Sequence, residues 1–84
     1  MPLFMDVHES MPEGATAADV AGAHEEDLKA QDRHGVKYLR YWVDEGARKV
    51  FCLVDAPSAE AAATVHREAH GLVAERIFEV VEGE

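Results

Sequence analysis

Stretches with the periodicity of a strand and stretches with the periodicity of a helix follow one another in this chain in an order that few folds accommodate. Alternating or aromatic and β-branched segments, typical of strands, occupy residues 3–8, 36–43, 50–54 and 75–81. Helix-forming segments at residues 17–34 and 59–70 separate the first strand from the second and the third from the fourth. This βαββαβ order predicts an α+β, ferredoxin-like fold, with two helices on one face of an antiparallel sheet.

The residues between these segments support the same division. Thr16 and Asp19 have the spacing of a capping box at the start of the first helix, and Gly35 and Gly71 are expected to end the two helices in a left-handed conformation. Between the second and third strands, Gly46 is expected to take the positive φ of a hairpin turn. With 84 residues, 48% of them hydrophobic, we expect one domain over residues 1–84. So short a chain buries a small core, which favours a homodimer.

Charge and cysteine content narrow the choice of partners. Eight basic and 17 acidic side chains give a net charge of −9, which disfavours nucleic acid and anionic membranes and favours cations. Cys52 is the single cysteine, and we expect it to be a small buried hydrophobe in its strand rather than a nucleophile. Without an expected disulfide, signal peptide or apolar membrane span, a cytoplasmic protein is predicted.

Alternation along the strands predicts which side chains face the helices. The face left open by the helices is expected to carry an aromatic set, made of Phe4, Asp6, His8, Tyr38, Arg40, Trp42, Phe51, Leu53, Asp55, Phe78 and Val80. The helix side then takes Met5, Val7, Leu39, Tyr41, Val50, Cys52, Val54 and Ile77. So apolar an open face predicts a homodimer formed sheet to sheet, although the alternation alone also permits the two faces to be exchanged.

Five histidines among 17 carboxylates suggest a site for a divalent transition metal. His66 and His70, one helical turn apart, have the spacing at which two imidazoles share one ion, and a helical wheel places both at the accessible rim of the apolar stripe. The alternative is a solvated pair. The segment lacks the glutamate of the H-E-x-x-H protease motif.

Three further side chains are candidates. His24 lies within the apolar stripe of the first helix, where Asp27, Cys52 or a side chain of the second helix is expected to be its hydrogen-bond partner. It is either a satisfied core histidine or a ligand or acid–base group. Asp6 and His8 point the same way from the first strand and form a chelating pair, a proton relay at the dimer interface or a plain surface pair.

The sequence resembles a family of short bacterial proteins, first known only as a domain of unknown function. The resemblance rests on residues 1–8, 34–42, 51–54 and 65–73, which read MPLFMDVH, HGVKYLRYW, FCLV and VHREAHGLV. It implies a ferredoxin-like homodimer that holds Ni(II) at the dimer surface, for nickel sequestration or tolerance rather than catalysis. The matching positions able to bind the metal are Asp6, His8, His24, His66 and His70.

Two other functions remain open at this point. Dimeric ferredoxin-like folds also host small cofactor-independent enzymes, in which His24 would act as the acid or base if a cavity adjoins it. The aromatic open face would alternatively serve a protein-interaction module that binds another protein.

Overall fold

A computed structural model describes residues 2–83. Its elements follow the predicted order: β1 Leu3–His8, α1 Ala17–Ala30, the 3₁₀ helix η1 Gln31–His34, β2 Lys37–Asp44, β3 Lys49–Asp55, α2 Ala59–Ala69 and β4 Arg76–Val80. The four strands form one sheet in the order β2-β3-β1-β4, and each neighbouring pair is antiparallel. The ferredoxin-like fold predicted from the sequence is therefore confirmed.

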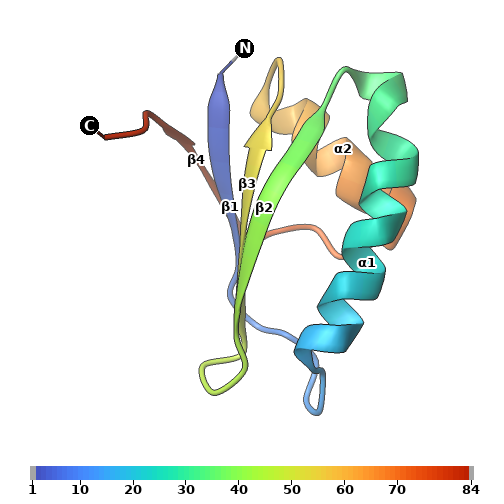
Figure 1. The fold of residues 1–84 in the computed structure, drawn as a ribbon, viewed down its shortest axis with the longest axis vertical. Helices are drawn as coiled ribbons and strands as arrows, with labels where there is room; N and C mark the ends of the chain where they lie inside the picture. The colour runs from blue at the N-terminus through green and yellow to red at the C-terminus, as the bar shows by residue number, and fades with distance from the viewer. Residues whose placement is uncertain (1, 84) are drawn as a thin grey trace.

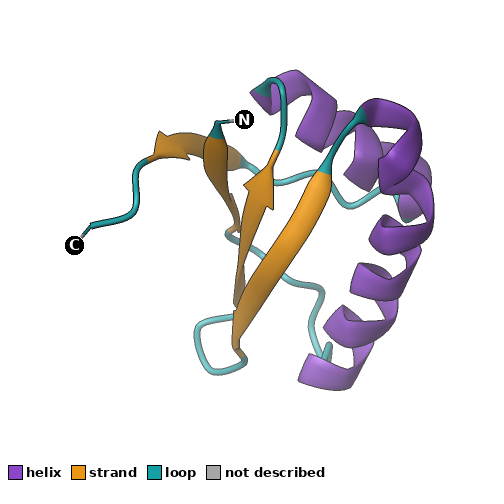
Figure 2. Ribbon diagram, turned by 45° about the horizontal axis from the view of Figure 1, so that its top comes forward, coloured by secondary structure: helices purple, strands orange, loops and turns teal. Residues whose placement is uncertain are grey.

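Both helices lie on the same side of the sheet (Figures 1 and 2), and the opposite side carries no helix of the described chain. The core between the two layers is built from small and β-branched side chains, led by Val36, Val54, Ala56, Ala62 and Val65. Within residues 2–83, no helix has the length and apolar character needed to cross a membrane.

The helix ends agree with the sequence signals. Thr16 and Asp19 form the reciprocal capping box of α1, in which the Thr16 side chain accepts from the Asp19 N–H and the Asp19 carboxylate accepts from the Thr16 N–H. Gly35 and Gly71 adopt φ values of 66° and 80°. The last turn of the expected helix at residues 17–34 is tightened into the 3₁₀ helix η1.

The expectation for Gly46 was wrong. In the β2–β3 turn, the residue with positive φ is Arg48, at 58°. The Asp44 carboxylate accepts the N–H of Ala47 at 2.9 Å, so a side chain closes the start of the turn and the left-handed residue falls two positions after Gly46.

The predicted face of β1 was also wrong. Asp6, which is 1% exposed, pairs with Cys52, and the buried Phe4 pairs with Val54. Directly opposite residues share a face of the sheet, so these side chains lie on the helix side with His8, while Leu3, Met5 and Val7 lie on the other face. The more apolar half of β1 therefore faces outward.

A bulge explains the mixed result for β2. The register shifts between Tyr38 and Arg40, which places Tyr38 on the helix side and leaves Leu39 exposed, against the prediction. Beyond the bulge the predicted alternation holds, with Trp42 exposed on the outer face. The predicted faces of β3 and β4 agree with the structure: Val50, Cys52 and Val54 are buried, Ile77 packs on the core and Phe78 is exposed.

Candidate metal centre

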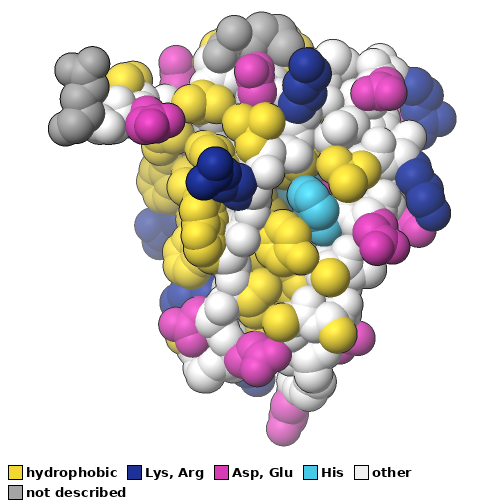
Figure 3. All heavy atoms as spheres, viewed as in Figure 1, with side chains coloured by type: hydrophobic (Ala, Val, Ile, Leu, Met, Phe, Trp, Pro, Cys, Tyr) yellow, Lys and Arg dark blue, Asp and Glu magenta, His cyan; other side chains and the backbone are white. Residues whose placement is uncertain are grey.

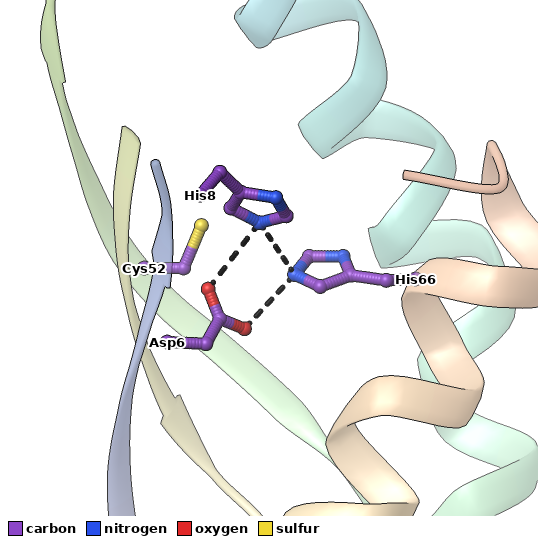
Figure 4. Close-up of side chains that lie close together, drawn as sticks. All are labelled: Asp6, His8, Cys52 and His66. Atoms are coloured by element: carbon purple, nitrogen blue, oxygen red, sulfur yellow. Dashed lines mark hydrogen bonds and ion pairs between the residues drawn. The ribbon is translucent and has the colours of Figure 1, made fainter. Parts of the chain in front are cut away.

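The first cluster of possible metal ligands joins β1 to α2 beneath the helical layer. Asp6 and His8, two residues apart on β1, project toward His66 of α2 (Figure 4). The His66 Nε2 atom lies 2.9 Å from Asp6 Oδ2 and 3.4 Å from His8 Nε2. His8 Nε2 is also 3.4 Å from Asp6 Oδ1. Three side chains from two elements thus converge on one point.

Cys52 belongs to the same cluster because β3 pairs it with Asp6. One ligand atom from each of Asp6, His8, Cys52 and His66 lies within 4.8 Å of every other. Metal–ligand bonds of about 2.0–2.3 Å leave ligand atoms roughly 3–4 Å apart. Small side-chain movements are therefore enough for these four to surround an ion.

A second group lies on the other side of the same imidazole. His66 Nδ1 is 2.8 Å from Asp27 Oδ1, and His70 Nε2 is 3.0 Å from the same oxygen. Asp27, His66 and His70 also have ligand atoms within 4.8 Å of one another. The predicted proximity of His66 and His70 is present, but a carboxylate from α1 lies between them.

The prediction that His66 is accessible was wrong, since its side chain is only 2% exposed. The helical wheel treated α2 as packing against one surface, whereas α2 contacts both the sheet and α1. The buried arc is therefore wider than the apolar stripe and includes His66. His70, at the end of α2, keeps 13% of its side chain exposed.

The two carboxylates determine the charge of His66. Burial opposes its protonation, but hydrogen bonds to Asp27 and Asp6, together with their charges, raise the pKa of His66 to about 9. Burial likewise acts to raise the pKa of Asp6, yet His66 and His8 lower it overall, well below its usual range. His66 and His70 also lower the pKa of Asp27 against the effect of its burial. Without a metal, an imidazolium thus lies between two buried carboxylates.

Tyr38 completes the surroundings of Asp6. Its hydroxyl lies 3.1 Å from Asp6 Oδ2 and 2.9 Å from the carbonyl oxygen of Ala62, and it can donate its single proton to one of them at a time. Among the described residues, Asp6 Oδ1 is buried and receives no hydrogen bond. A buried anionic oxygen that accepts no hydrogen bond, with the His8 ring nitrogen 3.4 Å away, is suited to a cation that both can bind.

His24 lies apart from both groups of ligands. It is half-buried on α1 and its ring packs against Tyr41, with the ring centroids 4.7 Å apart. Neither group of possible ligands among residues 2–83 contains His24. Asp27, expected as its partner, instead bonds His66 and His70. His24 lines a pocket of about 540 Å³ that His8, His66 and His70 also line.

Several contributors were not among the predicted site residues. Asp27 was assigned only a supporting role toward His24, Tyr38 was placed on the wrong face, and Cys52 was expected to serve as a buried hydrophobe. Cys52 is indeed buried, and burial followed by the Asp6 charge raises the pKa of its thiol. Helical spacing indicates which residues share one face of a helix, as with Asp27 and Gln31 or with His66 and His70. It gives no sign that Asp27 faces α2.

The donor set fits a borderline divalent ion. Imidazole nitrogens and carboxylate oxygens suit Ni(II), Zn(II) and Cu(II). The buried Asp6 Oδ1 atom, which accepts no hydrogen bond from the described chain and has His8 Nε2 at 3.4 Å, is an available oxygen donor. Asp6, His8 and His66 would hold such an ion, which would neutralise the carboxylate charge there.

Comparisons with known proteins agree with this chemistry. No curated protein matches the chain. The crystal structure of SCO4226 from Streptomyces coelicolor A3(2) is similar to it, with 36% sequence identity, a TM-score of 0.89, and coverage of 98% of this chain and 99% of that one. The model of the SCO4226-like family, described as nickel-responsive proteins, matches residues 4–80. A match over nearly the whole chain, together with the shared fold, confirms the resemblance seen in the sequence: the chain belongs to the SCO4226-like family of nickel-responsive proteins.

Proposed function

We propose that this protein binds Ni(II) without catalysing a reaction, and serves nickel sequestration or tolerance in the cytoplasm. The observation that carries the proposal is the convergence of Asp6, His8 and His66 on one buried point. The family's description as nickel-responsive supports nickel over zinc or copper, which the same donors also suit.

In the proposed site, His66 is the central ligand. Its Nε2 atom faces Asp6 and His8, and its Nδ1 atom faces Asp27, which can accept a hydrogen bond and fix the orientation of the ring. His70 contacts the same Asp27 oxygen and so helps to hold that carboxylate in place. Asp27 and His70 are therefore assigned to positioning in this proposal, and Asp6, His8 and His66 to nickel binding.

Titration calorimetry with NiCl₂ tests this assignment. His8 is the most informative position because its side chain is 15% exposed, so His8→Ala leaves the fold largely undisturbed. We expect this variant to lose at least tenfold in nickel affinity. His34→Ala is the matched control, since His34 pairs with Glu68 away from the cluster. Equal affinities of wild type and His8→Ala would overturn the ligand assignment.

The positions expected from sequence can be separated in the same experiment. If His66 and His70 share one ion, as their spacing suggested, His70→Ala removes the site while His8→Ala spares it. If Asp6, His8 and His66 hold it, the order is reversed, and His70→Ala weakens binding only modestly through the orientation of Asp27. His24→Ala should leave nickel affinity unchanged because His24 belongs to neither group within residues 2–83.

We further propose that the protein is a homodimer through its open sheet face. Leu39, Trp42 and Phe78 are each 48% exposed there. Hydrophobic side chains gather along this edge of the molecule in Figure 3. So large an apolar surface favours a two-fold partner of the same kind. A sedimentation-equilibrium mass equal to one chain at micromolar concentration would overturn this proposal and favour the interaction module.

The enzyme alternative requires a cavity at His24, and the pocket of about 540 Å³ provides one. The carboxylate expected beside His24, that of Asp27, is bonded to His66 and His70 instead. This balance favours metal binding over acid–base catalysis by His24.

A further inference from the structure

The pocket beside the ligand cluster is larger than a metal ion requires. About 540 Å³ of space lies between the loop after β1, helix α1 and the loop after α2. The buried Cys52 and His66 line it together with His8, so the pocket reaches the proposed nickel site. The volume of the pocket falls in the range of small-molecule pockets.

The proposed ligand set does not fill the coordination shell of nickel. Asp6, His8 and His66 supply three donors from the sheet and α2, and Cys52 is a fourth within reach. Metal sites with three protein ligands keep a position for an exogenous ligand. Because His8, Cys52 and His66 also line the pocket, an additional ligand would approach from there.

The walls of the pocket indicate what that ligand is. One part is apolar and is made of Met11, Val20, Ala23, Val50, Leu72 and Val73. The ionisable side chains lining it include the carboxylates Glu13, Asp19 and Glu75, and within residues 2–83 no lysine or arginine lines it. Together with Asp6 and Asp27, these carboxylates outnumber the two positive charges of a bound nickel ion. An anionic ligand would therefore meet net repulsion, whereas an uncharged molecule with an apolar body would not.

We infer that the pocket receives an uncharged, nitrogen-donor small molecule of the imidazole class, which completes the coordination of the bound metal and packs its apolar body against these walls. The inference rests on the proposed nickel site. It makes this protein a receptor for a metal together with an organic ligand, rather than for the ion alone.

Absorption spectroscopy of the nickel-loaded protein tests the inference. After removal of free nickel, the protein is titrated with 4-phenylimidazole, imidazole and benzoate while the d–d bands are followed. We expect 4-phenylimidazole to shift the bands with at least tenfold higher affinity than imidazole, because the apolar walls bury the phenyl ring. Benzoate should produce no shift at the same concentrations. Protein-bound nickel is measured after each titration to show that the ligand has not removed the metal.

Two variants fill the pocket from opposite walls. Ala23→Phe on α1 and Val73→Trp on the loop after α2 should keep nickel stoichiometry and lose at least tenfold in affinity for 4-phenylimidazole. Ala18→Phe is the matched control, since Ala18 is exposed on the same helix and does not line the pocket. Val73 is itself 38% exposed, so its replacement tests the wall even if Ala23→Phe disturbs helix packing.

The outcomes separate this inference from the proposed function. Stoichiometric nickel with no band shift from 4-phenylimidazole, or with equal affinity in both filled variants, overturns the inference and leaves the nickel site intact. Absence of nickel binding in the calorimetric titration overturns the proposed function, and the inference with it.

Discussion

The two faces of the sheet differ in a way that reverses the usual distribution of side chains. The face covered by the helices buries Asp6, Asp27 and His66, all at most 3% exposed, whereas the uncovered face presents Leu39, Trp42 and Phe78 to solvent. Buried charges are costly unless they are paired, and large exposed apolar surfaces usually mark contacts. This contrast is consistent with the two proposals made above, a metal ion on the covered side and a second chain on the uncovered side.

Removing the His66 imidazole should give the largest effect, a loss of folding stability. His66→Ala leaves the buried carboxylates of Asp6 and Asp27 next to an empty space, and we expect it to lower the free energy of unfolding by about 3–5 kcal/mol. Urea denaturation of the metal-free protein measures this. His34→Ala, which removes an exposed pair with Glu68, is the control and should change little. Similar midpoints for both variants would show that the buried network does not stabilise the fold.

The same network predicts how stability depends on pH. His66 has a raised pKa of about 9 against an ordinary value of 6.5, so its contribution is fully present below pH 6.5 and is lost as the pH rises through 9. The loss corresponds to a contribution on the order of 3 kcal/mol. Urea denaturation of the metal-free protein at pH 6, 8 and 10 should reveal the decline. A wild-type profile parallel to that of His66→Asn would contradict it.

On the uncovered face, a charge should break the proposed dimer without touching the metal site. Trp42→Glu places a carboxylate within the apolar patch, and we expect sedimentation to show a single chain at concentrations where the wild type is dimeric. Nickel bound per chain should not change. Leu28→Glu replaces a comparably exposed apolar residue on α1 and should leave the dimer intact. Loss of nickel in Trp42→Glu would mean that the two faces depend on each other.

The smallest effect is expected from replacing Cys52, which should change nickel affinity only slightly. Burial and the Asp6 charge raise the pKa of Cys52, so the thiol is protonated and is the weakest of the four donors. Cys52→Ser should therefore retain nickel stoichiometry and change affinity by less than about threefold, equivalent to under about 1 kcal/mol. Calorimetry measures the affinity, and a thiolate-to-nickel absorption band that disappears in the variant would instead assign Cys52 as a ligand.

The sequence predicted the order of the elements and the helix ends because these depend on local signals such as the Thr16–Asp19 capping box. It did not predict the face of β1, since alternation defines two sets of side chains but not which set is buried. The apolar Leu3, Met5 and Val7 suggested the wrong set. The charge of Asp6 can be buried because His66, 60 positions away in the sequence, pairs with it. The bulge in β2 likewise has no local signal.

The candidate site was predicted in part for the same reason. Asp6, His8, His66 and His70 were selected by residue type and spacing. The structure brings Asp6 and His8 close to the His66 imidazole, and it brings His70 close to the Asp27 carboxylate that His66 also contacts. Asp27 was not selected because its role depends on the packing of α1 beside α2, which neither helix specifies alone. His24 was selected for its place in the apolar stripe, but it contacts Tyr41 and the pocket instead.

The position of His66 between Asp6 and Asp27 has a consequence for the synthesis of the protein. Its two partners precede it by 60 and 39 residues, so a growing chain already contains both carboxylates and His8 before His66 has been added. During that interval the three donors of the proposed site cannot come together. If the proposed site is right, nickel capture by all three donors would wait until the ribosome has made most of the chain, and incomplete chains would lack the central ligand.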